Sequence, residues 1–272
     1  MPKIGQKIHR YEVVSSTNTL AKRLAAKGEE EGTVVIAETQ RKGKGRLGRV
    51  WESPKGGLWF SLILRPKTHP SKLPLITFMS SVAVAKALQE MFGLKVQVKW
   101  PNDVLIGNKK VCGILTEANT KGDVVNFVVV GIGINANIDL HSFSPDLRGS
   151  ATSLKTELQK TVDEGQLLQL VFEKLEYYYG LFQKGKYDVL LAEWKKLAAF
   201  LGKPVEVVSL DEKFVGKAVD VDENGALIIR LGDGSLRKIF SGDITIKFSF
   251  VSSILRLPAC LLGLFPFHSV FS

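Results

Sequence analysis

The stretch KWPNDVLIGNKKVCGILTEANTKGDVVNFVVVGIGI, residues 99–134, decides the fold class. It contains three apolar runs rich in β-branched residues, at 104–106, 110–118 and 124–134. Short turns separate them, at Gly107-Asn108 and Lys121-Gly122-Asp123. Strands joined by such turns pair antiparallel, because parallel strands need a long crossover. The pattern therefore predicts an α+β protein with a mixed, mainly antiparallel sheet, and argues against a doubly wound parallel fold.

The flanking sequence adds strands and helices to this sheet. We expect further strands at 11–14, 33–39, 58–64 and 96–100. A helix should follow an N-cap at Ser16 or Thr17, where Leu20, Ala21, Leu24 and Ala25 share one face and Gly28 is the expected C-cap. A mostly buried helix is predicted over 74–92, and two more within 164–200, divided at Gly185.

The composition changes after Gly202, where five short apolar runs alternate with turn signals. Short strands at this spacing predict a small closed or nearly closed β-barrel. We therefore expect a large domain over residues 1–200 and a small β-barrel domain over 201–248.

Residues 249–272 form an atypical apolar tail of unknown role, with no acidic residue and a single basic residue, Arg256. Pro258 and Pro266 interrupt it, which leaves it short of the about 20 apolar residues of a membrane span. Three interpretations stay open: a membrane or partner anchor, an ordered extension packed on the barrel, and a non-native end such as a shifted reading frame. The proline breaks favour the last two.

The chain has 272 residues and a net charge of +10. Such a charge fits either a soluble basic surface or an acidic partner such as nucleic acid, nucleotide phosphates or an acidic protein. The two cysteines, Cys112 and Cys260, suggest neither a disulfide framework nor a zinc site, and the four histidines are isolated. The N-terminus is charged where a signal peptide is apolar, so we expect a cytoplasmic protein.

Residues 43–48, GKGRLG, match the dinucleotide-binding pattern G-x-G-x-x-G, but we reject that interpretation. The true motif opens a helix and is followed by an acidic residue about 20 positions later, and neither holds here. Five basic residues crowd the segment: Arg41, Lys42, Lys44, Arg46 and Arg49. Their mutual repulsion predicts a mobile loop that an anionic ligand would order, although a solvated surface loop is the alternative.

Two further segments carry candidate site residues. Lys99, Lys109 and Lys110 bring positive charge near Asp103, which could hold a metal, orient a nucleophile or simply form a turn. Gly113 within a strand indicates the close approach of a ligand or another backbone. The run 131–137, GIGINAN, could cap a nucleotide pocket or merely end a strand.

Together these segments resemble the biotin–protein ligase family. The resemblance covers roughly residues 10–137 in the family's order, and is carried by Ser16-Thr17-Asn18, Glu38-Thr39-Gln40, Gly43 to Trp51, Lys99 to Asp103, Lys110 to Leu115 and Gly131 to Asn135. It implies a catalytic domain like that of class II aminoacyl-tRNA synthetases and a small SH3-like barrel. One departure is Lys44, where the family commonly has Arg, so the planar guanidinium fork is lost and its effect on biotin affinity is open.

The resemblance implies that ATP and biotin react to biotinyl-AMP, and that biotin then passes to a lysine of a biotin carboxyl carrier protein. It assigns catalysis to Lys110, Arg46 and Asp103, with Asp103 also a possible Mg²⁺ ligand. The implied biotin-binding residues are Ser16, Thr17, Asn18, Gln40, Lys44, Gly45, Arg46, Lys110 and Gly113. The implied ATP or adenylate residues are Arg46, Arg49, Trp51, Lys99, Asn102, Lys110, Gly133 and Asn135.

Some family members carry an N-terminal DNA-binding domain. Because the Ser-Thr-Asn motif already begins at Ser16, we expect the ligase-only type, with no DNA or membrane partner and by analogy a homodimer. The sequence does not identify the individual carrier protein. Three rival interpretations remain: a lipoate–protein ligase, a non-catalytic nucleic-acid-binding protein, and an inactive chain whose tail spoils the barrel. The basic loop has no aromatic residue before Trp51, which disfavours the second.

Overall fold

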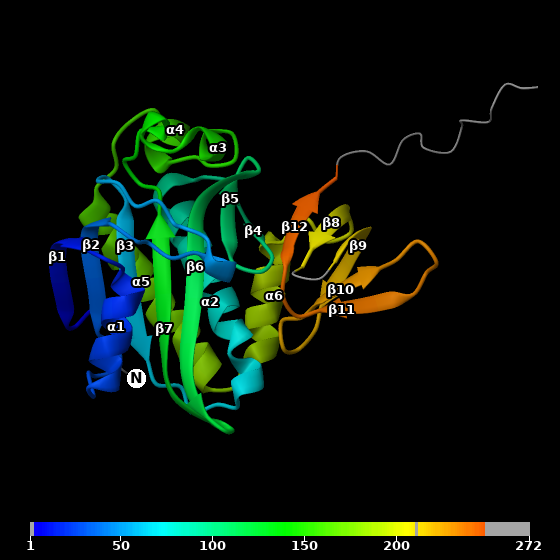
Figure 1. The fold of residues 1–272 in the computed structure, drawn as a ribbon, viewed down its shortest axis with the longest axis horizontal. Coiled ribbons are helices and arrows are strands. Elements are labelled where there is room, and N and C mark those ends of the chain that lie inside the picture. The colour runs from blue at the N-terminus through cyan, green and yellow to red at the C-terminus, as the bar shows by residue number, and fades with distance from the viewer. Residues whose placement is uncertain (1–2, 210–211, 248–272) are drawn as a thin grey trace, which may run out of the picture.

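The computed structural model describes residues 3–209 and 212–247, and it is built on a seven-stranded sheet in the order β1-β2-β3-β7-β6-β5-β4 (Figure 1). The strands are β1 (Ile8–Val14), β2 (Val34–Gln40), β3 (Leu58–Leu64), β4 (Val96–Lys99), β5 (Asp103–Ile106), β6 (Lys109–Lys121) and β7 (Val124–Ile134). Only β1 and β2 run parallel, and every other neighbouring pair is antiparallel. The mixed, mainly antiparallel sheet predicted from residues 99–134 is confirmed.

Burial explains the central position of β3, and tight turns explain the pairing of β5, β6 and β7. β3 is buried along its whole length, as expected of a central strand apolar on both faces. Gly107 and Asn108 both have positive φ, which are the angles a two-residue hairpin between β5 and β6 needs. A second turn, at Gly122, connects β6 to β7. The two strands pair antiparallel and form a long hairpin at the centre of the sheet.

Helices cover both faces of the sheet (Figure 1). α1 (Thr17–Ala26) begins at the N-cap Ser16 and packs Ala21 and Ala25 with Val35, Ile63 and Val129 on one face. The other face carries α2 (Pro74–Phe92), α5 (Glu164–Gln183) and α6 (Tyr187–Leu197), which join the larger core. α2 ends at Gly93 in the left-handed conformation, as the sequence predicts.

Residues 70–92 are long and apolar enough to cross a membrane by length and composition alone, but this segment is largely buried within the fold. The stacking of Phe78 on Trp194, with ring centroids 4.2 Å apart, shows α2 packed directly on α6. The apolar character of α2 is therefore explained by its central position in the core.

The C-terminal strands form a second sheet in the order β11-β10-β9-β8-β12. They are β8 (Pro204–Val208), β9 (Lys213–Val221), β10 (Leu227–Arg230), β11 (Leu236–Ile239) and β12 (Asp243–Ile246). All pairs are antiparallel, in agreement with the small SH3-like β-barrel, although no pairing between β11 and β12 closes it within the described residues. The predicted tail, 249–272, lies outside these residues.

The small sheet is fastened to the larger unit by polar contacts. Buried Trp100 donates its indole N–H to the carbonyl of Gly225 at 3.0 Å. Lys72 donates to the Asn224 side chain at 2.9 Å, and Lys195 pairs with Asp220 at 2.7 Å. A separate contact, from Arg46 to the Gly242 carbonyl at 3.0 Å, places the start of β12 beside the basic loop.

Five short helices were not predicted from the sequence. They are η1 (Arg46–Gly48), η2 (Pro70–Lys72), η3 (Leu140–Ser142), α3 (Pro145–Arg148) and α4 (Leu154–Leu158). Each spans at most five residues, which is too short for an apolar repeat of 3.6 residues to show.

Candidate functional site

A cavity of about 350 Å³ opens where the basic loop, α1 and the β5–β6–β7 strands meet. All sixteen residues proposed from the sequence line it: Ser16, Thr17, Asn18, Gln40, Lys44, Gly45, Arg46, Arg49, Trp51, Lys99, Asn102, Asp103, Lys110, Gly113, Gly133 and Asn135. They come from four separate segments of the chain, which the fold brings to one place.

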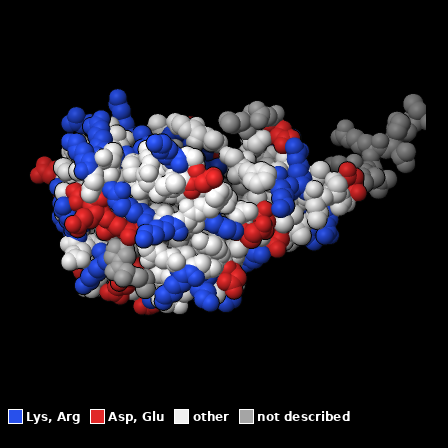
Figure 2. All heavy atoms as spheres, turned by 90° about the horizontal axis from the view of Figure 1, so that it is seen from below, with Lys and Arg blue, Asp and Glu red and all other residues white. Residues whose placement is uncertain are grey.

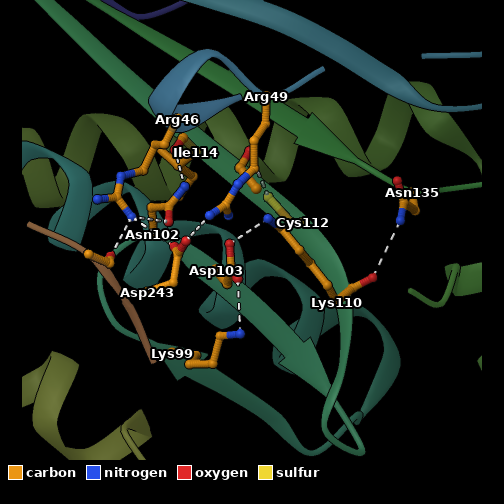
Figure 3. Close-up of polar contacts among 12 residues, drawn as sticks. Arg46, Arg49, Lys99, Asn102, Asp103, Lys110, Cys112, Ile114, Asn135 and Asp243 are labelled. Atoms are coloured by element: carbon orange, nitrogen blue, oxygen red, sulfur yellow. Dashed lines mark hydrogen bonds and ion pairs between the residues drawn. The ribbon is translucent and has the colours of Figure 1, made fainter. Parts of the chain in front are cut away.

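Three charged side chains form one part of the cavity (Figure 3). Lys110 Nζ lies 2.5 Å from Asp103 Oδ1, and Lys99 Nζ lies 3.4 Å from Asp103 Oδ2. The Lys110 ammonium also lies 4.9 Å from the ring centroid of Trp51, within the range of a cation–π contact. One carboxylate is thus shared by two lysines, which leaves a net positive charge facing the cavity.

The basic loop has a defined path that closes one side of the cavity. Antiparallel backbone pairing of Gln40 with Ser53 and of Lys44 with Val50 gives the loop the form of a hairpin. At its tip Arg46 donates to the Gly242 carbonyl at 3.0 Å and lies 3.3 Å from Asp243 Oδ1, while Arg49 pairs with the same carboxylate (Figure 3). The mobility expected of this loop without an anion stays a prediction, and Asp243 of β12 is a counter-charge that the sequence did not suggest.

Burial of Arg46, whose side chain is only 19% exposed, lowers its pKa, and Asp243 and Asp103 oppose that effect. A guanidinium stays protonated in either case. The loop therefore presents a fixed, partly desolvated positive charge to the cavity.

An uncharged polar group forms another part of the cavity. Gln40 Oε1 accepts from the backbone N–H of Thr17 at 2.8 Å and from its hydroxyl at 3.1 Å. Ser61 Oγ lies 2.8 Å from Thr17 Oγ1 and 2.6 Å from Asn18 Oδ1. Ser61 is fully buried in β3 and was not proposed from the sequence, because a lone serine within an apolar strand gives no signal.

Glycines on β6 and β7 let side chains lie directly on the sheet. A Cβ at Gly133 would meet the Trp51 indole at 2.5 Å, and one at Gly113 would meet it at 2.7 Å. A Cβ at Gly131 would lie 2.0 Å from Asn18 Oδ1. A close approach was predicted at Gly113, but a side chain, Trp51, makes it here instead of a ligand or another backbone.

The position of these groups along the hairpin sets the length of the site. Gly113 pairs with Gly133, and Leu115 pairs with Gly131 two residues further along. A strand rises about 3.3 Å per residue, so Asn18 and Trp51 lie roughly 7 Å apart along the strands. The uncharged group and the cationic group therefore occupy successive stretches of one cavity.

Comparison with known proteins identifies the family. Residues 11–135 match the Biotin/lipoate A/B protein ligase family, and residues 200–247 match the Biotin protein ligase C terminal domain. The Bifunctional ligase/repressor BirA of Bacillus subtilis (strain 168) is 37% identical over 242 residues, which cover 89% of this chain and 74% of that protein. The chain belongs to the biotin protein ligase family.

Two other matches extend the comparison across the family. The Biotin–[acetyl-CoA-carboxylase] ligase of Paracoccus denitrificans is 32% identical over 223 residues, which cover 79% of this chain and 90% of that protein. Among solved structures, the biotin protein ligase from Aquifex aeolicus in complex with biotin and ATP matches with a TM-score of 0.78 and 30% identity, over 90% of this chain and 100% of that one. Between them these matches cover 79% and 90% of this member of the biotin protein ligase family.

One wall of the cavity was missed by sequence reasoning. It consists of Phe143, Leu147, Ser150 and Ala151, which follow the GIGINAN run. Ala151 pairs with Lys110 in a parallel bridge, and Phe143, Ala151 and Trp59 form a small apolar cluster that Trp51 joins. The wall is held by backbone hydrogen bonds of Lys110 with Ser150 and Thr152 and by side-chain contacts to backbone groups, which leave no sequence periodicity. Glu52 and Asp243 also line the cavity and were not proposed.

Asn135 is placed differently from the sequence interpretation. It lines the cavity, but its amide nitrogen donates to the Thr152 carbonyl at 2.9 Å and is also 3.4 Å from the Lys110 carbonyl (Figure 3). Its side-chain oxygen has no partner within the described residues. The Asn135 amide nitrogen thus connects the wall at Thr152 to the Lys110 segment by hydrogen bonds. Only the side-chain oxygen of Asn135 is available to a ligand.

A metal site built by protein ligands alone is absent from residues 3–209 and 212–247, where three His, Cys, Asp or Glu side chains nowhere cluster. Asp103 is the residue proposed for Mg²⁺, and lysines engage both of its oxygens. Asp103 as a Mg²⁺ ligand stays a prediction, since a metal that bound there would have to compete with both lysines.

Proposed function

We propose that this enzyme activates biotin with ATP and transfers it to the ε-amine of a specific lysine on a biotin carboxyl carrier protein. The biotin carboxylate attacks the α-phosphorus of ATP and pyrophosphate leaves. The carrier amine then attacks the acyl carbon of biotinyl-AMP, and AMP leaves. The observation that carries the proposal is the single cavity in which an uncharged hydrogen-bonding group is followed by a cluster of cations.

Lys110 is the group we propose to stabilise the first transition state. A carboxylate must approach a polyphosphate, so cations in the site have to offset a strong repulsion. Lys110 and Lys99 are held in place by Asp103 before substrates bind. Their ammonium groups would turn from Asp103 to the biotin carboxylate and the α-phosphate, because together the substrate carboxylate and the triphosphate carry more negative charge than Asp103 alone.

Arg46, Arg49 and Lys44 would close over the adenylate. An acyl-adenylate hydrolyses when water reaches it, so a loop that covers it protects the intermediate. In this structure Arg46 and Arg49 rest on Asp243. The phosphate of the adenylate would compete with that carboxylate for the two guanidinium groups.

The uncharged group suits the ring of biotin. A cyclic urea is neutral and needs fixed donors and acceptors, which Ser16, Thr17, Asn18 and Gln40 provide around the cavity. Gly45 and Gly113 allow the backbone to approach the ligand.

The adenosine would lie against the cavity wall that follows the GIGINAN run. Phe143, Leu147 and Ala151 offer an apolar surface beside Trp51, and the Asn135 oxygen is a free acceptor for an amino group. Asn102 and Gly133 complete the lining. Mg²⁺, held through Asp103 and the phosphates, would neutralise part of the phosphate charge when bound.

For the cellular setting we propose a cytoplasmic homodimer whose reaction uses neither DNA nor a membrane. The names of the relatives support a carboxylase carrier as the partner. On the face drawn in Figure 2, Lys and Arg side chains are interspersed with Asp and Glu, and they do not form one continuous basic track of the kind that follows a nucleic-acid backbone.

ATP–pyrophosphate exchange, measured with biotin, with lipoate and with neither, tests the proposal directly. Exchange that requires biotin is the expected result. Exchange that requires lipoate would assign the chain to the lipoate branch of the matched family, and no exchange from a folded sample would refute the adenylation step.

A further inference from the structure

The small sheet contributes one carboxylate to the cavity. Asp243 is the first residue of β12, where its backbone pairs with Val208 of β8, and its side chain lines the cavity. One of its oxygens lies 3.3 Å from Arg46, and the other is paired with Arg49 (Figure 3). Because the Asp243 side chain is 30% exposed, it lies at the rim of the cavity and within reach of solvent.

The charges of the cavity suit the first step of the proposed reaction better than the second. Its lining contains more cations than carboxylates: Lys44, Arg46, Arg49, Lys99 and Lys110 against Glu52, Asp103 and Asp243. This excess of positive charge attracts ATP and the biotin carboxylate. Once pyrophosphate has left, biotinyl-AMP carries a single negative charge, on its phosphate, so the occupied cavity remains net positive.

The second substrate approaches this lining with a charge of the same sign. A lysine side chain is an ammonium ion at neutral pH, because its ordinary pKa is about 10.4. Its entry into a net positive cavity is unfavourable unless a carboxylate faces it on the way in. The second step therefore requires an accessible carboxylate near the adenylate.

Asp243 meets this requirement better than the other two carboxylates. Glu52 accepts from the Ser144 backbone N–H at 3.0 Å, which ties it to the cavity wall. Asp103 also loses its lysines when they turn to the substrates, but at 13% exposure it lies deeper than Asp243. The partners of Asp243 are the two arginines that the adenylate phosphate would take over. Formation of the adenylate would therefore free a carboxylate at the rim, where the carrier lysine enters.

We propose that Asp243 binds the ammonium group of the incoming carrier lysine after the adenylate has drawn Arg46 and Arg49 away. The inference rests on the proposed function, since it adds a residue to its second step. The bound ammonium loses one proton to solvent, and the nitrogen lone pair attacks the acyl carbon. The amide C–N bond forms, the bond from that carbon to the phosphate oxygen breaks, and its electron pair leaves with AMP. The nitrogen then loses its second proton to solvent.

The test compares two nucleophiles in the variant Asp243→Asn. Enzyme loaded with synthetic biotinyl-AMP is mixed either with an apo biotin carboxyl carrier domain of acetyl-CoA carboxylase or with hydroxylamine, which is uncharged at neutral pH. Transfer to the carrier domain should slow about ten- to a hundredfold, the equivalent of one hydrogen bond between charged groups. The reaction with hydroxylamine should stay within about twofold of the parent. Asp243→Glu, which restores the charge, should recover most of the transfer rate.

Glu206→Gln is the matched control. Glu206 also lies on the small sheet and also holds two cations, Lys213 at 3.3 Å and Lys247 at 3.2 Å, but it does not line the cavity. It should leave both rates unchanged. An unchanged carrier rate in Asp243→Asn, or equal slowing with both nucleophiles, would overturn the inference while biotin-dependent pyrophosphate exchange by the parent upholds the function. Absence of that exchange in the parent would overturn both.

Discussion

Replacement of Lys110 by Ala tests the central step of the proposed chemistry. In this structure the Lys110 ammonium has two neighbours, Asp103 at 2.5 Å and the Trp51 ring at 4.9 Å. Its side chain is 30% exposed, so the ion pair contributes at most about 1 kcal/mol to folding after solvent screening. If Lys110 stabilises the transition state like other donors aimed at developing negative charge, its loss raises the barrier by about 2–4 kcal/mol. Adenylate formation should then slow roughly 30- to 1000-fold, with a small change in stability.

The assay is single-turnover formation of biotinyl-AMP, together with a thermal melt of each variant. Lys110→Ala also leaves Asp103 with only Lys99, at 3.4 Å, so part of any loss could come from an uncompensated carboxylate. The double variant Lys110→Ala with Asp103→Asn removes that charge and should stay slow. Near-normal adenylate formation in Lys110→Ala, or full recovery in the double variant, would refute the assignment of Lys110.

Four further expectations follow from the same geometry. Arg46→Ala should release free biotinyl-AMP and label bystander proteins, and retention of the adenylate as in the parent would contradict a shielding loop. Asp243→Asn removes the carboxylate that holds the basic loop, so limited proteolysis should cut the loop faster without ATP and equally with it. Gly133→Ala places a Cβ 2.5 Å from the Trp51 indole and should weaken ATP binding at least tenfold by equilibrium titration, whereas unchanged affinity would show that Trp51 is free to move. A chain ending at Lys247 should match the full chain in melting temperature and exchange rate, and a clear loss of either would show that the tail is needed.

The regular elements of the large domain could be predicted because their signals are local. The boundaries of β3, α2 and the β6–β7 hairpin follow from an apolar run, a C-cap glycine and two-residue turns, each of which acts within a few residues. The residues around the cavity could be proposed because four ordered motifs carry a family resemblance. The hydrophobic periodicity of the sequence does not by itself indicate that these four motifs meet at one cavity.

What the sequence does not reveal depends on contacts between distant segments. The wall at Phe143 and Ala151 is held by backbone hydrogen bonds to Lys110 and by the Asn135 side chain, and Ser61 contacts Thr17 and Asn18 only because the fold brings them onto β3. Neither arrangement produces a hydrophobic periodicity that could be recognised within a short stretch of sequence. Asn135 illustrates the same limit, since its amide nitrogen is engaged by Thr152 from the missed wall.

The basic loop shows how the fold can add counter-charges that a local argument about charge does not include. Five like charges in one segment predict mutual repulsion, yet two carboxylates from other strands offset it. Asp243 of β12 pairs with Arg46 and Arg49, and the charge of Lys44 is one of the causes that lower the pKa of Glu117 of β6. An entering polyphosphate must therefore displace carboxylates as well as neutralise cations.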